Sequence, residues 1–206
     1  MPLWKKIALT IVAFAVLSLI GIVTIACFFW HSITDSEAVK KTADSFMTMS
    51  DPLPEGFVFG HGYALNNVPL VEIRCKGANK NLIFRFTQIS GANQATSEST
   101  PEQVIDETAK GFVPGLIGAK SLQKIEVFEH STLPVGGIQM PYVIGHINTP
   151  LSKDKSTANA FIGVVRSTKS KKLIMLLAER YDLGISTHGP LTIKDVTPLT
   201  DAVKSF

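Results

Sequence analysis

The sequence predicts an α+β protein, with an N-terminal transmembrane helix followed by an α/β/α sandwich built on a mainly antiparallel sheet. Three observations lead to this prediction. A long apolar run without charged residues occupies residues 7–30. Beyond it, short segments with alternating apolar and polar residues are separated by turn residues, as in antiparallel sheets. Stretches with helical spacing of apolar residues lie before, between and after these segments, so helices are expected to cover the sheet.

The apolar run from Ile7 to Trp30 is long enough to cross a membrane. As a helix it would extend roughly 36 Å at 1.5 Å per residue, which exceeds a hydrocarbon core of ~30 Å. Lys5 and Lys6 precede the run, whereas the first Lys or Arg after it is Lys40. The positive-inside rule therefore places residues 1–6 in the cytoplasm and the rest of the chain outside the cytoplasmic membrane, in a periplasmic or extracellular position.

Two other interpretations of this N-terminus stay open. A cleaved signal peptide would also begin with basic residues, although its apolar region is typically ~7–15 residues and this one is longer. Cys27 lies in a context that partly matches a bacterial lipoprotein signal, but the bulky residues 28–30 follow it. Of the three interpretations, we favour a retained span.

The remainder divides into a juxtamembrane amphipathic helix at residues 31–50 and an extracytoplasmic α+β domain at residues 51–206. All 17 acidic residues and 18 of the 20 basic residues follow residue 30, which leaves this part with a charge of only +1. Nothing in the overall charge therefore attracts nucleic acid. Cys75 is the only cysteine beyond the span, so stability must come from a hydrophobic core and not from an internal disulfide.

Helices are expected at three places. Residues 34–37 (TDSE) read as a capping box that starts the juxtamembrane helix. Residues 100–103 (TPEQ) are a second capping box with proline at the first helical position. A third helix is expected to start at Thr197-Pro198 and to run to Phe206.

About seven strands are expected between these helices. They cover residues 57–59 and 63–65, 70–75, 82–89, 122–128, 138–147, 160–166 and 173–178. The last of them, LIMLLA, is a continuous apolar run and is expected at the centre of the sheet, because a central strand is buried on both faces.

The order of these segments resembles a known group of proteins. The stretches AVKKTADSFMTMSDPLPEGF, TPEQVIDETAKGF and FIGVVRSTKSKKLIMLLAERYD are similar to single-pass bacterial membrane proteins of unknown function whose exported domains are PsbP/Mog1-like. The resemblance implies the α/β/α sandwich. It carries no catalytic motif and implies no activity.

Gly60-His61-Gly62 is the strongest candidate for a ligand site. Glycines allow close approach of the backbone, so His61 and the nearby Tyr63 could contribute polar groups to a pocket. The alternative, which we favour, is that this string marks a bulge or kink in a strand. A second candidate is the basic turn around Arg166, Lys169, Lys171 and Lys172, which could contact lipid headgroups or a partner, or could be a solvated hairpin tip.

Other chemistry-bearing residues form no recognisable pattern. His130, His146 and His188 lack the spacing of a metal site. Cys75 alternates with apolar residues and is expected in the core. Two S-x-x-K strings, at residues 121–124 and 152–155, lie in an expected strand and an expected loop and not at a helix start. No catalytic residue, metal or cofactor is assigned.

These features favour a membrane-anchored, non-enzymatic binding or accessory module that presents its domain to a protein partner. A lipid-binding or small-ligand-binding domain is the alternative, and a hydrolase is the third possibility. An enzyme would require acid, base and nucleophile groups that converge in space. A deep closed pocket would favour the second reading and converging groups the third.

The orientation can be tested with reporters fused after Phe206. A reporter that is active only outside the cytoplasm should be active, and one that is active only in the cytoplasm should be silent, because Lys5 and Lys6 hold the N-terminus inside. The reverse pattern would overturn the assigned orientation.

Overall fold

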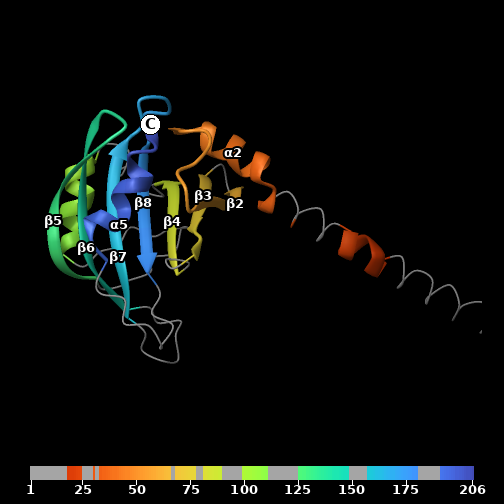
Figure 1. Cartoon of the computed structure of the whole chain (residues 1–206), viewed down its shortest axis with the longest axis horizontal. Coiled ribbons are helices and arrows are strands. Elements are labelled where there is room, and N and C mark those ends of the chain that lie inside the picture. Colours follow the sequence, from red (N-terminus) through yellow and green to blue (C-terminus); the bar gives the residue numbers. More distant parts are fainter. Residues whose placement is uncertain are drawn as a thin grey trace, which may run out of the picture.

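A computed structural model gives the fold of the chain. The residues that it describes are 18–24, 30, 33–65, 68–77, 81–89, 99–110, 125–148, 157–180 and 191–206. They form an α+β structure whose main sheet is antiparallel throughout, as the sequence predicts (Figure 1).

Seven strands form the main sheet, in the spatial order β2-β3-β4-β8-β7-β6-β5. Two runs of consecutive strands, β2 to β4 and β5 to β8, therefore meet where β4 pairs with β8. The strands are β2 (Phe57–Leu65), β3 (Val68–Cys75), β4 (Leu82–Gln88), β5 (Ile125–Val135), β6 (Ile138–Asn148), β7 (Thr157–Arg166) and β8 (Leu173–Arg180).

Strand β8 is the middle strand of the seven, and all eight of its residues are buried. The central position expected for LIMLLA is thus confirmed. Its even-numbered residues, such as Leu176, pack in one core cluster, and its odd-numbered residues, such as Met175, pack in the other. Both faces of the sheet are therefore apolar where β8 passes.

Helices cover both faces of this sheet. Helices α2 (Ser36–Asp44) and α5 (Ile193–Thr200) pack on the face that carries Leu176, through side chains such as Val39 and Leu199. Helix α4 (Pro101–Ala109) packs on the opposite face through Val104 and Ile105. We call these the α2/α5 face and the α4 face. Because α2 shares the core of the sheet, its residues belong to the folded unit.

The capping box is confirmed for α4 but not for α2. At α4, the Thr100 hydroxyl accepts from the Gln103 backbone N–H at 3.3 Å and the Gln103 side chain accepts from the Thr100 N–H at 2.8 Å. At α2 the N-cap is Asp35, which makes no capping hydrogen bond through its side chain. The Thr34 hydroxyl donates instead to the Trp30 carbonyl oxygen at 2.9 Å, so it is occupied by the preceding turn.

The prediction for the C-terminal helix was wrong in position. Helix α5 begins four residues earlier than Thr197, with Pro198 inside it, and the chain then forms strand β9 (Val203–Ser205). This strand pairs with β1 (Thr48–Met49) in a separate two-stranded sheet. The spacing of Val203 and Phe206 matches a helix, but β9 ends at Ser205, and the two side chains are both buried in the core because Phe206 lies beyond the strand.

The expected transmembrane span lies largely outside the described residues. Within it, residues 18–24 are helical and extend away from the sheet (Figure 1). Four aliphatic side chains of this segment, those of Leu19, Ile20, Ile22 and Val23, are more than half exposed. Among the described residues, no helix has both the length and the hydropathy needed to cross a membrane.

Gly60-His61-Gly62 forms an irregularity in strand β2, as the favoured reading expected. Phe59 lies opposite Ile73 and Gly62 lies opposite Val71, so the two residues between them face a single residue of β3. Gly62 does not have a positive φ. A glycine is needed at position 62 because there is no room for a side chain. A Cβ atom there would lie 2.9 Å from the Cα of Val39 in α2.

Gly62→Ala should therefore lower the free energy of unfolding by about 2 kcal/mol or more, since backbone contact cannot be relieved by side-chain rotation. Gly60→Ala is the matched control in the same bulge. Its Cβ would meet the ends of the Arg74 and Glu72 side chains at 3.1 Å, which can adjust. Denaturant unfolding of the full chain in detergent would measure both variants. Equal destabilisation by the two would contradict the packing explanation.

Candidate functional site

His61 is part of an ion-pair network on the α4 face of the sheet. Its Nδ1 lies 3.2 Å from Glu72 Oε1 and 3.0 Å from Arg74 Nη2. Arg74 Nε also donates to Glu72 Oε1 at 2.6 Å. An arginine can only donate, so its contact needs a lone pair on Nδ1, whereas the contact with the carboxylate needs a proton there. The position of the ring proton thus decides which of the two neighbours Nδ1 binds.

Glu72 is the centre of this network. It is only 7% exposed, and its second oxygen, Oε2, accepts from Arg85 Nε at 3.2 Å. Arg85 also pairs with the buried Glu179 of β8. Burial alone would raise the pKa of the Glu72 carboxyl, but hydrogen bonds from Arg74 and His61 and the charges of Arg85 and Arg74 lower it overall. The network ties together strands β2, β3, β4 and β8.

Tyr63 lies opposite Leu70, on the same face of the sheet as Glu72. Neither Tyr63 nor His61 lines either of the two cavities described below. The His61 ring instead lies with its centroid 5.8 Å from that of Trp30, in an edge-on arrangement. The structure thus brings His61 next to the end of the expected span and not into a pocket.

The basic turn joins β7 to β8, and two of its four basic residues bind other parts of the chain. Arg166 donates to the carbonyl oxygens of Lys171 and Ser99, at 2.8 Å and 2.6 Å. Lys169 Nζ donates to the Thr48 hydroxyl at 2.6 Å. Lys171 and Lys172 are exposed. The turn is therefore attached to the rest of the domain through Arg166 and Lys169, and its exposed charges are those of Lys169, Lys171 and Lys172.

Cys75 is buried in the α2/α5 core, as predicted, and burial raises the pKa of its thiol to about 11. It is therefore a poor nucleophile at neutral pH. His130 and His146 lie on opposite faces of the sheet, since His130 faces α4 and His146 does not. Among the described residues, no three His, Cys, Asp or Glu side chains are grouped to hold a metal ion. His188 and both S-x-x-K strings lie outside the described residues.

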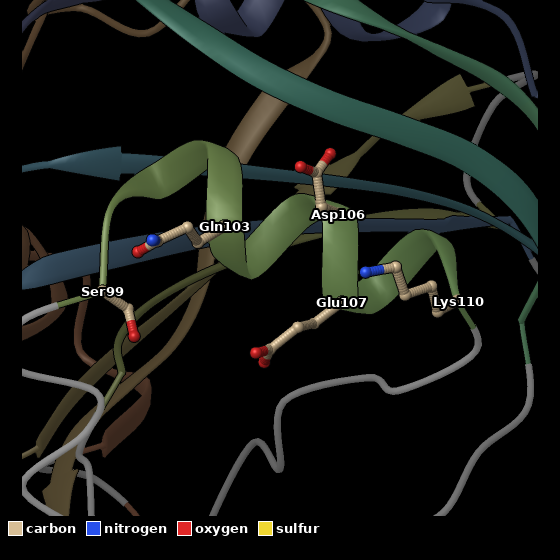
Figure 2. Close-up of a pocket in the computed structure, with 5 residues that line it drawn as sticks. All are labelled: Ser99, Gln103, Asp106, Glu107 and Lys110. Atoms are coloured by element: carbon tan, nitrogen blue, oxygen red, sulfur yellow. The ribbon is translucent and has the colours of Figure 1, made fainter.

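One shallow cavity, of about 280 Å³, lies along the outer side of α4. Figure 2 shows that its side chains come from α4 and the residues next to its two ends, and that they point in different directions. They belong to Ser99, Gln103, Asp106, Glu107 and Lys110. Such a divergent set on a helix surface is typical of a solvated helix face and does not form a binding site.

A second cavity, of about 350 Å³, lies at the β5 edge of the sheet. It is lined by Glu126, Val127, Phe128 and His146. Phe128 lies at a second bulge, between Val127 and Glu129 on edge strand β5, and is 50% exposed. Its ring centroid is 5.2 Å from that of His146.

This cavity stands at the outer end of a row of polar residues, which we call the polar row. Glu126 lies opposite His146, His146 opposite Asn159, and Asn159 opposite Arg180. Residues directly opposite each other have their side chains on the same face, so the four cross the α2/α5 face in line. Exposure falls along it, from the exposed Glu126 to the buried Asn159 and Arg180.

The inner end of the polar row is held by α5. Arg180 Nη2 lies 2.7 Å from Asp195 Oδ1. Burial would raise the pKa of Asp195, but hydrogen bonds from the Thr192 backbone and from Arg180 lower it. In the middle of the row, two buried side-chain atoms have no hydrogen-bond partner among the described residues, namely His146 Nδ1 and Asn159 Oδ1.

The polar row was not predicted from the sequence. His146 was considered only as a metal ligand, and Glu126, Phe128 and Asn159 were assigned no role. Their strands were expected, but the registers between strands that are distant in sequence were not. A polar residue within an expected strand, such as His146 in the strand expected at 138–147, is the signal that could have pointed to the row, whereas Asn159 lies just before the strand expected at 160–166.

Glu72→Gln should lower the free energy of unfolding by about 2–3 kcal/mol, because it removes the charge that compensates Arg85 and Arg74. The folded-state pKa of Glu72 is lowered, so its contribution is present above the unfolded-state pKa of about 4.3 and is lost as the pH falls through the folded-state value. Denaturant unfolding across acid pH should therefore show a shallower loss of stability for Glu72→Gln than for the wild type. Glu102→Gln, at an exposed position of α4, is the control, and a Glu72→Gln variant that matched it would contradict a central role for Glu72.

No protein-family model matches the chain, and no curated protein matches it. Several solved structures are similar to part of it. One is the apo structure of the immunity protein TplEi of T6SS from Pseudomonas aeruginosa, with a TM-score of 0.36, 15% identity, and coverage of 67% of this chain and 44% of that one. Another is LpqN, involved in cell envelope biogenesis of Mycobacterium tuberculosis, with a TM-score of 0.34, 18% identity, and coverage of 75% and 80%. The chain thus spans less than half of the immunity protein, and at these TM-scores neither likeness supports a functional argument.

Proposed function

We propose that this protein is a membrane-anchored, non-enzymatic binding or accessory module, which presents an extracytoplasmic domain to a protein partner. The anchor is the span at residues 7–30, with residues 1–6 in the cytoplasm. The exposed aliphatic side chains of residues 18–24 support it, because such a surface is stable in contact with lipid and not with water. The PsbP/Mog1-like resemblance stays a prediction about the fold and contributes no function.

The observation that carries the partner-binding proposal is the half-exposed Phe128 on edge strand β5. It is the one large aromatic side chain of the described sheet that is exposed to this degree. Aromatic residues are enriched at protein interfaces, because they bury a large area with few rotatable bonds. The bulge at this position turns the ring outward, which is a common use of bulges at sheet edges.

The partner is expected to bind through side chains and not by adding a strand. Strand β5 carries Pro134, which cannot donate from its backbone, and its bulge interrupts the regular edge. Glu126 and His130 add exposed polar or charged groups along it. Such features protect edge strands from pairing with other chains. The free edge therefore offers a rigid platform whose specific contacts lie around Phe128.

The domain is also held close to the membrane. Helix α2 begins six residues after Trp30 and packs into the core, and Trp30 itself contacts the His61 ring. With the span embedded, the domain would be close to the bilayer. A partner that lies in or at the same membrane would thus meet it at a high effective concentration.

The proposal predicts which position captures the partner in living cells. A photo-crosslinking phenylalanine analogue in place of Phe128 should give a discrete adduct, since it keeps the aromatic ring at the interface. The same analogue at Glu102, on the opposite face of the sheet, is the control. The analogue at Lys172 tests the basic turn as the competing surface. Adducts at Lys172 alone, or adducts at none of the three positions, would contradict binding at β5.

A further inference from the structure

The structure assigns a ligand chemistry to the cavity beside Phe128, and we infer that it binds an arginine side chain of the partner. This inference rests on the proposed function, because it names the group that the partner presents at the β5 edge. It is carried by the polar row and by two buried atoms in that row that lack hydrogen-bond partners among the described residues.

Four residues line the cavity, namely Glu126, Val127, Phe128 and His146, and Asn159 follows His146 in the polar row without lining the cavity itself. Glu126 contributes a carboxylate at the entrance, and Phe128 contributes the edge or face of its ring. With its ring proton on Nε2, His146 presents Nδ1 as an acceptor. Behind it, Asn159 Oδ1 is a second buried acceptor, in a residue that is only 9% exposed. A carboxylate and two acceptors repel an anion and favour a ligand that is cationic and donates several hydrogen bonds.

The spacing of these acceptors favours guanidinium over ammonium. His146 and Asn159 lie directly opposite each other on adjacent strands, which are about 4.8 Å apart in a sheet. A guanidinium group carries five N–H donors in a flat fork and can bind two acceptors at that spacing, whereas an ammonium group is a compact point charge. A guanidinium above Phe128 also gains from contact with the aromatic ring.

The far end of the polar row sets the depth of the site. Arg180 follows Asn159 in the row and its charge is balanced by Asp195, at 2.7 Å. It therefore closes the row with a group that cannot accept a hydrogen bond. The ligand is expected to stop at Asn159, where the last acceptor is.

A peptide-binding experiment with the full-length chain in detergent micelles tests this. The probes are acetyl-Gly-Arg-Gly-amide, its citrulline analogue, which has the same shape without the charge, its lysine analogue, and free spermidine. Binding is followed through the imidazole resonances of histidine-labelled protein. The arginine peptide should shift the His146 resonances and the citrulline peptide should not.

Two variants and one control locate the site. Glu126→Gln should weaken binding of the arginine peptide about fivefold or more, whereas Glu107→Gln, which removes the same charge at the other cavity, should not. Asn159→Leu should also weaken binding, but it should not lower the melting temperature, because it removes a buried acceptor that has no partner among the described residues. If Asn159 had only a structural role, its replacement would lower the melting temperature and leave binding of the arginine peptide unchanged.

Several outcomes would overturn the inference. They are the absence of binding, equal binding of the citrulline peptide, tighter binding of the lysine peptide, or equal sensitivity to Glu107→Gln. Spermidine that bound as tightly as the arginine peptide would exclude a specific partner side chain. Failure of the crosslink at Phe128 with arginine binding intact would count against the proposed function alone, and a crosslink without arginine binding would count against this site alone.

Discussion

The pairing of β4 with β8 is the contact on which the rest of the structure depends. It joins one meander, β2 to β4, to another, β5 to β8, and its pairs range from Gln88 with Ile174 to Leu82 with Arg180, which are 86 and 98 positions apart. Strand β8 is buried on both faces, and its apolar side chains belong to the core cluster that contains residues of α2 and α5 on one face and to the cluster that contains residues of α4 on the other. The Arg85–Glu179 ion pair spans the same junction on the α4 face. Both the Glu72 network and the polar row end on β8, so the two polar features share this support.

The parts of the fold that were predictable from the sequence depend on local patterns. Helix α4 starts where a capping box with proline at the first position indicates it, and the run LIMLLA is the central strand. The start of α2 was less well predicted, because Thr34 had an equally good acceptor in the turn before it. At the C-terminus, Phe206 is buried under either a helix or a strand, and only the pairing of β9 with β1 decides between them. That pairing is a contact between the two ends of the domain, which no local pattern encodes.

Because local patterns do not encode long-range pairing, they also missed the candidate site. Gly60-His61-Gly62 attracted attention because its residues are adjacent in sequence, and it proved to be a bulge whose histidine contacts Glu72 and Arg74. The polar row has the opposite character. Its members come from four strands, between Glu126 and Arg180, and none has a partner in the row within ten positions in the sequence. Only the registers of three strand pairs place them in line, and those registers follow from the packing of the whole sheet.

The Glu72 network and the polar row differ in whether their buried polar atoms have hydrogen-bond partners within the domain. In the network around Glu72, both carboxylate oxygens accept hydrogen bonds from arginines, so the buried charge is compensated within the domain. In the polar row, His146 Nδ1 and Asn159 Oδ1 are buried without partners among the described residues, next to a half-exposed aromatic ring. A buried acceptor without a partner costs about 1–3 kcal/mol. An apolar residue at position 159 would remove that cost without opening a void, so stability alone does not account for the asparagine. The asparagine is explained if its acceptor receives a hydrogen bond from a bound ligand. The strand register places this acceptor in line with the cavity at the β5 edge, where such a ligand would enter.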